Sequence, residues 1–208
     1  MTDDFRRRTA LRAGAGAVVG LAGCLGVPGR DDDTQTPEAD LPTPSLGPDD
    51  PDAARSVVAV WTDYRCPHCA TFARTVLPAV RANLVDDGVR VEHHDFPVPV
   101  DRWSWRVAIA ARSVQQRAGT AAFWTFSDRA YARQRETDDT TVVRELAAGA
   151  GADPDAVAAS VRRERQRPVV EADRRRGRRR GVRGTPTVFV DGERVDATYT
   201  AVAAAVRG

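Results

Sequence analysis

The chain has 208 residues, a length that fits one folded domain with terminal appendages. Hydrophobic residues make up 42% of it and charged residues 29%, which excludes a long disordered array. The 31 basic and 29 acidic side chains leave a formal net charge of +2, so bulk charge does not call for a polyanionic partner.

Residues 1–24 are predicted to form an export signal. Arginines at positions 6–8 precede a mildly apolar stretch, residues 13–27, which is too short to span a bilayer comfortably. Paired arginines before such a stretch resemble a twin-arginine (Tat) signal, and residues 21–24 resemble a lipobox that ends in the lipidated Cys24. An ordinary cleaved signal and an uncleaved hydrophobic anchor are the alternatives. All three predict an extracytoplasmic protein, and the lipobox predicts a lipoprotein tethered to the membrane through Cys24.

Residues 25–54 are predicted to be a disordered, acidic, proline-rich tether. Between Asp31 and Ala54 there are eight acids and no base, and large apolar side chains are almost absent. Such a segment cannot bury enough apolar surface to order itself, and its charges repel one another. The folded domain is therefore expected to occupy residues 55–208.

The folded part begins with a strand–helix–strand pattern. Residues 56–61 form a continuous apolar run rich in β-branched side chains, as expected of a strand buried on both faces. From Cys66 to Leu84 apolar residues recur every three or four positions, which predicts an amphipathic helix with Pro67 in its first turn. Residues 89–96 predict a second strand, parallel to the first if the helix is the crossover.

A helical insertion is predicted from residue 101 to about residue 166, followed by a basic helix and a strand pair. Asp191-Gly192 is the strongest short hairpin signal, and it separates two short strands. The predicted elements after the second strand are helices at 103–116 and 121–132, helices starting near Asp139 and Asp153, strands at 187–190 and 194–195, and a closing helix at 197–206. The fold class is α/β with a helical insertion.

The chemistry is predicted to reside in Cys66-Pro67-His68-Cys69, at the junction of the first strand and the first helix. A thiolate at the start of a helix faces unpaired backbone N–H groups and the positive end of the helix dipole, which lower its pKa. His68 can add a further donor or positive charge, and Cys69, one turn along on the inward face, can reach Cys66 to close a disulfide. Cys66 is thus the predicted attacking thiol and Cys69 the resolving one. Stabilising the thiolate makes the disulfide a stronger oxidant, which points to a donor of disulfides.

These motifs resemble the DsbA-like thiol:disulfide oxidoreductases of the thioredoxin superfamily. The resemblance spans about residues 56–208 and implies a thioredoxin fold with a helical insertion between its two halves. Its matching segments are residues 63–69 with Phe72, residues 95–97, Phe123-Trp124 and residues 184–187.

The resemblance also implies roles for the loop at Gly184-Thr185-Pro186. The bond before Pro186 would be cis, Pro186 would pack beside the cysteines, and the Thr185 backbone would pair with a bound client. Client proteins and a membrane-bound reoxidant would be the partners, and the cysteine pair would serve without a further cofactor. One departure is Val60, because some thioredoxin-like proteins keep a buried acidic residue at that position, six residues before the first cysteine.

Two other functions remain open. A reductase or isomerase on the same fold would differ in redox poise and in its regenerating partner. A metal-binding chaperone would use Cys66 and Cys69 as ligands together with His93 or His94. Adjacent residues on a strand point to opposite faces, so at most one of these histidines could easily join, and both fit better as solvent-side or strand-packing residues. No nicotinamide, flavin or metal motif is present, and export disfavours nucleic acid as a partner.

Two groups of side chains have a structural and a functional interpretation. The aromatic residues of the insertion fit a core, or they line a peptide-binding surface: Trp103, Trp105, Phe123, Trp124 and Phe126. The arginine-rich segment from Arg162 to Arg183 fits a solvated helical face, or it contacts an anionic membrane or an acidic partner.

Overall fold

The computed structural model describes residues 41–98 and 101–208. The predicted signal, Cys24 and residues 25–40 of the predicted tether lie outside the described residues. None of the helices in the described ranges is long and apolar enough to cross a membrane.

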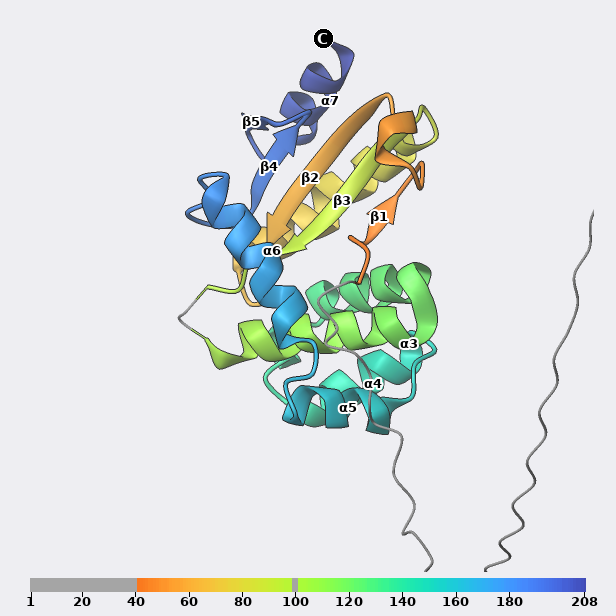
Figure 1. Ribbon diagram of the computed structural model, residues 1–208, viewed down its shortest axis with the longest axis vertical. Helices are drawn as coiled ribbons and strands as arrows, with labels where there is room; N and C mark the ends of the chain where they lie inside the picture. Colours follow the sequence, from red (N-terminus) through yellow and green to blue (C-terminus); the bar gives the residue numbers. More distant parts are fainter. Residues whose placement is uncertain (1–40, 99–100) are drawn as a thin grey trace, which may run out of the picture. The chain divides into compact units, whose positions relative to one another are not determined.

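A mixed five-stranded sheet with the order β1-β3-β2-β4-β5 forms the centre of the domain (Figure 1). β2 (Ser56–Thr62) and β3 (Val89–Asp95) are parallel, as predicted. β4 (Thr187–Val190) runs antiparallel to β2 and forms a hairpin with β5 (Glu193–Val195). Asp191 and Gly192 both have positive φ in its turn, as the Asp-Gly signal predicts.

The predicted start of the folded domain is wrong. β1 (Ser45–Leu46) pairs antiparallel with β3 at the edge of the sheet, and residues Pro51–Ala53 form the short 3₁₀ helix η1. The composition correctly indicates that this stretch has no core of its own, but it orders by using the unpaired edge of β3. For example, the His93 N–H donates to the Pro44 carbonyl at 2.9 Å. Residues 41–54 therefore belong to the fold, not to a disordered tether.

One helical run connects β2 to β3, as predicted. It consists of α1 (Pro67–Thr71), the π-helical η2 (Phe72–Val76), α2 (Leu77–Val80) and the π-helical η3 (Arg81–Val85). Its apolar positions face the sheet, and Gly88, with φ +83°, makes the turn into β3.

The helical insertion gathers beyond the carboxyl ends of β2 and β3 (Figure 1). Gly119, with φ 85° and ψ 176°, interrupts the first helix and separates the two predicted helical segments. Asp139 and Asp153 accept hydrogen bonds from the first turns of the helices that follow them, as expected of N-caps. The remaining helices are α3 (Arg102–Ala132), η4 (Gln134–Glu136), α4 (Thr140–Gly149), α5 (Pro154–Arg162), α6 (Arg167–Arg179) and α7 (Tyr199–Arg207).

The two faces of the sheet bury different sets of side chains. Val58 and Val60 of β2 pack into the main core, whereas Trp61 packs into a smaller cluster on the opposite face. His93 and His94 follow the same alternation: His93 contacts Phe123 in the main core, and His94 stacks on Trp61 at 4.3 Å between ring centroids. Both histidines are buried, so the strand-packing interpretation holds and the solvent-side one does not.

A buried ion-pair network joins the sheet to the insertion. The guanidinium of Arg112, on α3, donates to Asp95 at the end of β3 at 2.6 Å and to Asp173 on α6 at 2.5 Å. All three side chains are at most 7% exposed. Pairing and hydrogen bonding offset the cost of removing these charges from water.

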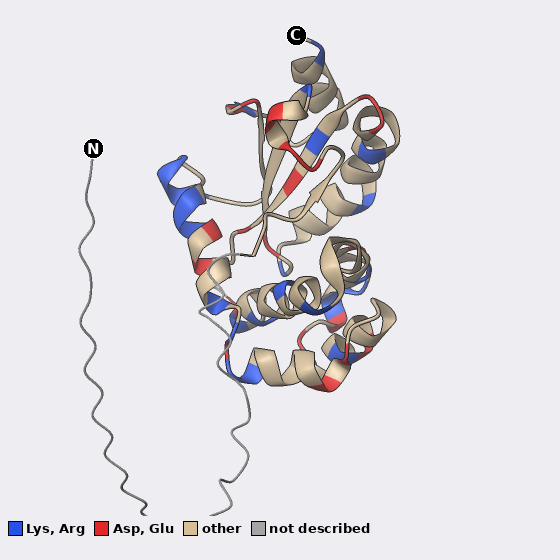
Figure 2. Cartoon of the chain, turned by 45° about the vertical axis from the view of Figure 1, so that its right-hand side comes forward, with Lys and Arg blue, Asp and Glu red and all other residues tan. Residues whose placement is uncertain are grey.

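The insertion's aromatic residues are mostly core, because Trp103, Phe123, Trp124 and Phe126 are buried and only Trp105 is partly exposed. α6 buries Val169, Val170, Asp173 and Gly177 and exposes most of its arginines, which Figure 2 shows as blue turns concentrated towards its C-terminal end. The exposed arginines of α6 therefore fit the interpretation of this segment as a solvated helical face.

Candidate active site

The two cysteines lie where the chain leaves the sheet. Cys66 is the N-cap of α1, with extended φ/ψ of −79° and 119°, and Pro67 is the first helical residue. Cys66 is partly exposed, whereas Cys69 is fully buried at 0%. Both thiols are free in the structure.

The pKa of the Cys66 thiol is lowered from 9.0 to about 5. The largest cause is a hydrogen bond from the Cys69 thiol, which burial partly opposes. The backbone N–H groups of Cys69 and His68 also stabilise the anion. Cys66 is therefore a thiolate at neutral pH, the form that attacks disulfides.

Cys69 has the opposite character. Burial raises its pKa, and its hydrogen bond to Cys66 raises it further because the proton is held between the two sulfurs. The Asp63 N–H donates to the Cys69 sulfur at 3.4 Å. The proton of the pair thus resides on the buried sulfur, and the negative charge on the accessible one.

The loop before β4 lies beside Cys66, although more than a hundred residues separate them. The Thr185–Pro186 bond is cis, as the resemblance implies. The Cys66 thiol lies 3.3 Å from the Thr185 carbonyl oxygen, and the Thr187 hydroxyl donates to the Gly184 carbonyl at 2.8 Å. Thr185 and Pro186 are partly exposed, so the loop and the cysteine form one accessible surface.

His68 contributes to the site through its backbone N–H group, which stabilises the Cys66 anion. Its side chain is exposed, and no hydrogen bond from the imidazole to Cys66 occurs within the described residues. This differs from the expectation that the ring is directed at the sulfur. Val60, at the position where some thioredoxin-like proteins keep a buried acidic residue, is an apolar side chain buried in the core.

Gln134, on η4 in the middle of the insertion, was not predicted as part of the site. Its side-chain amide donates to the carbonyls of Tyr64 and Cys66, at 2.8 Å each. Arg65 also ties the cysteine motif to the insertion, because its guanidinium pairs with Asp101 at 2.8 Å and donates to the Gln134 carbonyl at 2.7 Å. Arg65 borders the cysteine motif and could have been suspected, whereas no sequence signal marks Gln134.

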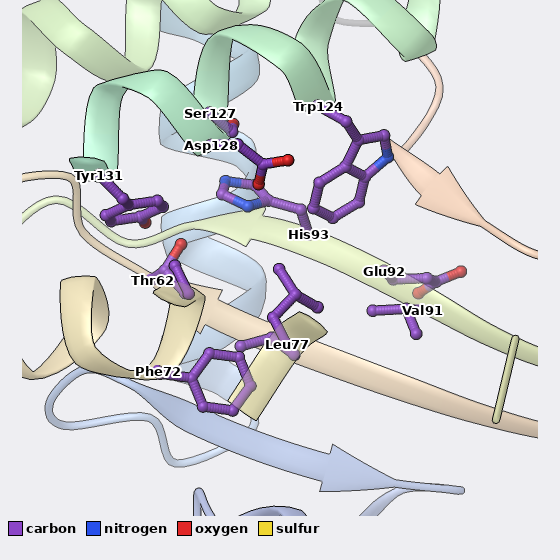
Figure 3. A pocket seen from close by; sticks show the side chains of 12 residues that line it. Thr62, Phe72, Leu77, Val91, Glu92, His93, Trp124, Ser127, Asp128 and Tyr131 are labelled. Atoms are coloured by element: carbon purple, nitrogen blue, oxygen red, sulfur yellow. The ribbon is translucent and has the colours of Figure 1, made fainter. Parts of the chain in front are cut away.

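In the part of the chain that the structure describes, the cysteine site includes neither a cluster of metal-ligating side chains nor the small cavity beside His93. The described part of the chain contains no group of three or more His, Cys, Asp or Glu side chains that could hold a metal ion. A small cavity of about 20 Å³ is lined by Thr62, His93, Ser127 and Tyr131 among others (Figure 3), but neither cysteine lines it. His93 faces this cavity instead of the cysteine pair.

The difference between the two thiols determines what the pair can do. An accessible thiolate and a buried thiol within reach of each other can pass through a mixed disulfide and then close or open a disulfide of their own. On the fold described above, this makes the protein a DsbA-like thiol:disulfide oxidoreductase whose redox group is its own cysteine pair. A family model described as Thioredoxin matches residues 49–207, and the chain belongs to that family.

Curated relatives include the probable disulfide bond formation protein D of Bacillus anthracis, 24% identical over 168 residues, which covers 78% of this chain and 76% of the relative. Disulfide bond formation protein D of Bacillus subtilis is 24% identical over 153 residues, covering 71% and 67%. Among solved structures, oxidised BdbD from Bacillus subtilis superposes with a TM-score of 0.71 at 22% identity, covering 80% of this chain and 94% of that one. Chlamydia trachomatis DsbA gives 0.69 at 19% identity, covering 81% and 92%. These structures share the fold with this chain.

Proposed function

We propose that this protein donates a disulfide to client proteins. A client thiolate attacks Cys66 of the oxidised pair, a bond forms between the client sulfur and the Cys66 sulfur, and the Cys66–Cys69 bond breaks. Cys69 leaves with the electron pair and takes up a proton. A second client thiolate then attacks the mixed disulfide, which leaves the client oxidised and Cys66 as a thiolate.

The low pKa of Cys66, about 5, is the observation that carries this direction of transfer. A reduced form stabilised as a thiolate makes the oxidised form the stronger oxidant, and a low-pKa thiol is also the better leaving group in the last step. The raised pKa of Cys69 ensures that this sulfur holds a proton once it is released.

The loop at Gly184, Thr185 and Pro186 is the proposed docking place for the client backbone. Its support is the 3.3 Å approach of the Thr185 carbonyl to the Cys66 sulfur together with the partial exposure of both. An extended client segment paired with this loop would bring its sulfur to Cys66.

The proposed location is extracytoplasmic, with Cys24 lipidated as the membrane tether and a membrane-bound partner that reoxidises the pair. The twin-arginine-like signal and the lipobox at residues 21–24 support the location and the tether. The names of the relatives, disulfide bond formation proteins, support a role in oxidation. Fractionation tests the tether: Cys24→Ala should release the protein from membranes or block its processing, and unchanged processing with retention in the membrane fraction would contradict it.

The oxidation of a reduced two-cysteine peptide by the oxidised protein, together with the reduction potential of the pair against glutathione, tests the direction of transfer. We expect rapid oxidation and a potential well above the roughly −270 mV of thioredoxin. A potential near that of thioredoxin would favour the second candidate, a reductase or isomerase on the same fold.

A further inference from the structure

A charged groove opens beside Cys66, on the side of the helical insertion. It has a volume of about 590 Å³ and lies between α1 and the segment where α3 ends and η4 begins. Arg65 and Pro67, the two chain neighbours of Cys66, line it together with Ala70, Thr71 and Tyr131. A polypeptide joined to Cys66 through its sulfur would therefore pass over the mouth of this groove.

Arginines dominate the charge of the groove. Four line it, against one glutamate, Glu136. Arg133 already neutralises that glutamate, with an ion pair of 2.7 Å. Arg65 is likewise committed to Asp101 at 2.8 Å.

The other two arginines of the groove, Arg74 and Arg135, are exposed, and the guanidinium of neither forms an ion pair or hydrogen bond with any residue of the described ranges. They approach the groove from its two walls, since Arg74 lies on η2 and Arg135 on η4. Two positive charges that have no ion-pair partner in the described ranges and face one concave surface attract negative charge and repel positive charge.

We propose that this groove selects client segments in which acidic residues flank the reactive cysteine, a proposal that rests on the disulfide exchange at Cys66 proposed above. An extended chain advances about 3.3 Å per residue. Acidic side chains a few positions from the client cysteine therefore reach Arg74 and Arg135 while the client sulfur is bound to Cys66. The groove acts on the encounter and on the lifetime of the mixed disulfide, and the chemistry at sulfur is unchanged.

Charge-matched peptides test this proposal. Reduced two-cysteine peptides are prepared that differ only in three residues beside the cysteine pair, which are all Asp, all Ser or all Arg, with the block placed on either side. We expect kcat/KM for oxidation to follow the order Asp, Ser, Arg for at least one placement, with about a tenfold span at low ionic strength. At 1 M salt, where the Debye length is about 3 Å, the span should collapse to about twofold.

Two double variants identify the surface responsible. Arg74→Glu with Arg135→Glu should abolish or reverse the order, with each rate taken relative to that of the Ser peptide on the same variant. Arg194→Glu with Arg207→Glu makes the same charge change at exposed positions on β5 and α7 and should retain the order. Equal rates for Asp and Arg peptides at low salt, or an unchanged order in the groove variant, would overturn the proposal.

The outcome for the Ser peptide separates this inference from the proposed function. If that peptide is oxidised but charge has no effect, only the groove proposal fails. If it is not oxidised at all, the oxidase proposal fails, and the charge order is then measured on reduction of the same peptides in their disulfide form.

Discussion

The Cys66 thiol and the Thr185 carbonyl oxygen lie 3.3 Å apart across 119 residues of sequence. This contact joins the two halves of the thioredoxin fold at the point where the chemistry occurs. The reactive sulfur thus lies beside the loop at Thr185, while its chain neighbours Arg65 and Pro67 line the charged groove between α1 and η4.

The two cysteines should differ sharply when each is replaced. Cys66→Ser should abolish exchange with a disulfide-linked peptide, because the accessible thiolate is lost. Cys69→Ser should accumulate a mixed disulfide between Cys66 and the peptide, since no neighbouring thiol remains to resolve it. Mass spectrometry under non-reducing conditions measures the adduct. Equal residual turnover by both variants would contradict the assigned roles.

The pKa of Cys66 should depend on Cys69 more than on the His68 side chain. Thiolate absorbance of the reduced wild-type protein should titrate with a midpoint of about 5. Cys69→Ala removes the hydrogen bond that contributes most to the lowered pKa and should shift the midpoint upward. His68→Ala keeps the backbone N–H and should shift it less. A larger shift for His68→Ala would mean that the imidazole, not the Cys69 thiol, controls the anion.

The stability of the reduced form relative to the oxidised form should fall as pH decreases from about 9 to about 5. The folded-state pKa of Cys66 is lowered from 9.0 to about 5, so its stabilising contribution is complete above pH 9 and is lost as pH falls through 5. Cys69 has a raised pKa and stays protonated throughout this window. The oxidised protein lacks both titrations and serves as the reference. Melting temperatures of the two forms whose difference is constant between pH 9 and pH 5 would exclude a lowered pKa for Cys66.

Loss of the buried guanidinium of Arg112 should be costly. Arg112→Met leaves Asp95 and Asp173 buried without their cation, which should lower the free energy of unfolding by about 3–5 kcal/mol at pH 7. Without Arg112 the pKa of both carboxyls rises, so the deficit should shrink as pH falls from 7 towards 4. In the wild-type protein the pKa of Asp173 is about 2, and this carboxylate stays charged over that range. Denaturant unfolding at both pH values measures the change.

Arg144→Met is the matched control for Arg112→Met, because the ion pair of Arg144 with Asp155 lies on the surface. Its replacement should change stability little and without this pH dependence. Equal losses for the two variants, or a deficit that does not change with pH, would show that Arg112 acts through packing alone.

Two helical glycines should respond differently to replacement by alanine. A Cβ at Gly177 would lie 2.6 Å from Nε1 of Trp61, a ring that is 0% exposed and stacked on His94. Gly177→Ala should therefore lower stability by about 1–3 kcal/mol through overpacking. At Gly149 the new Cβ would meet only the end of the flexible Arg129 side chain, so Gly149→Ala should be neutral or slightly stabilising. Equal melting temperatures for the two variants would show that α6 can move away from Trp61.

Local patterns in the sequence determine much of this protein. The apolar run at Ser56–Trp61, the periodicity after Pro67 and the Asp191-Gly192 turn each specify an element through interactions between near neighbours, and all three elements form where predicted. The spacing of Cys66 and Cys69 also indicates their asymmetry, because one turn of helix carries the second cysteine to the buried face.

Only the tertiary structure decides the features that depend on distant partners. β1 orders on the edge of β3, although its own composition predicts disorder, because the backbone hydrogen bonds come from another strand. Gln134 reaches the Cys66 carbonyl, and Arg74 and Arg135 face one groove, only because the insertion folds back over the cysteine motif. Contacts between residues far apart in sequence leave no periodic signal, and so the cysteine pair can be predicted from the sequence while the surface that surrounds it cannot.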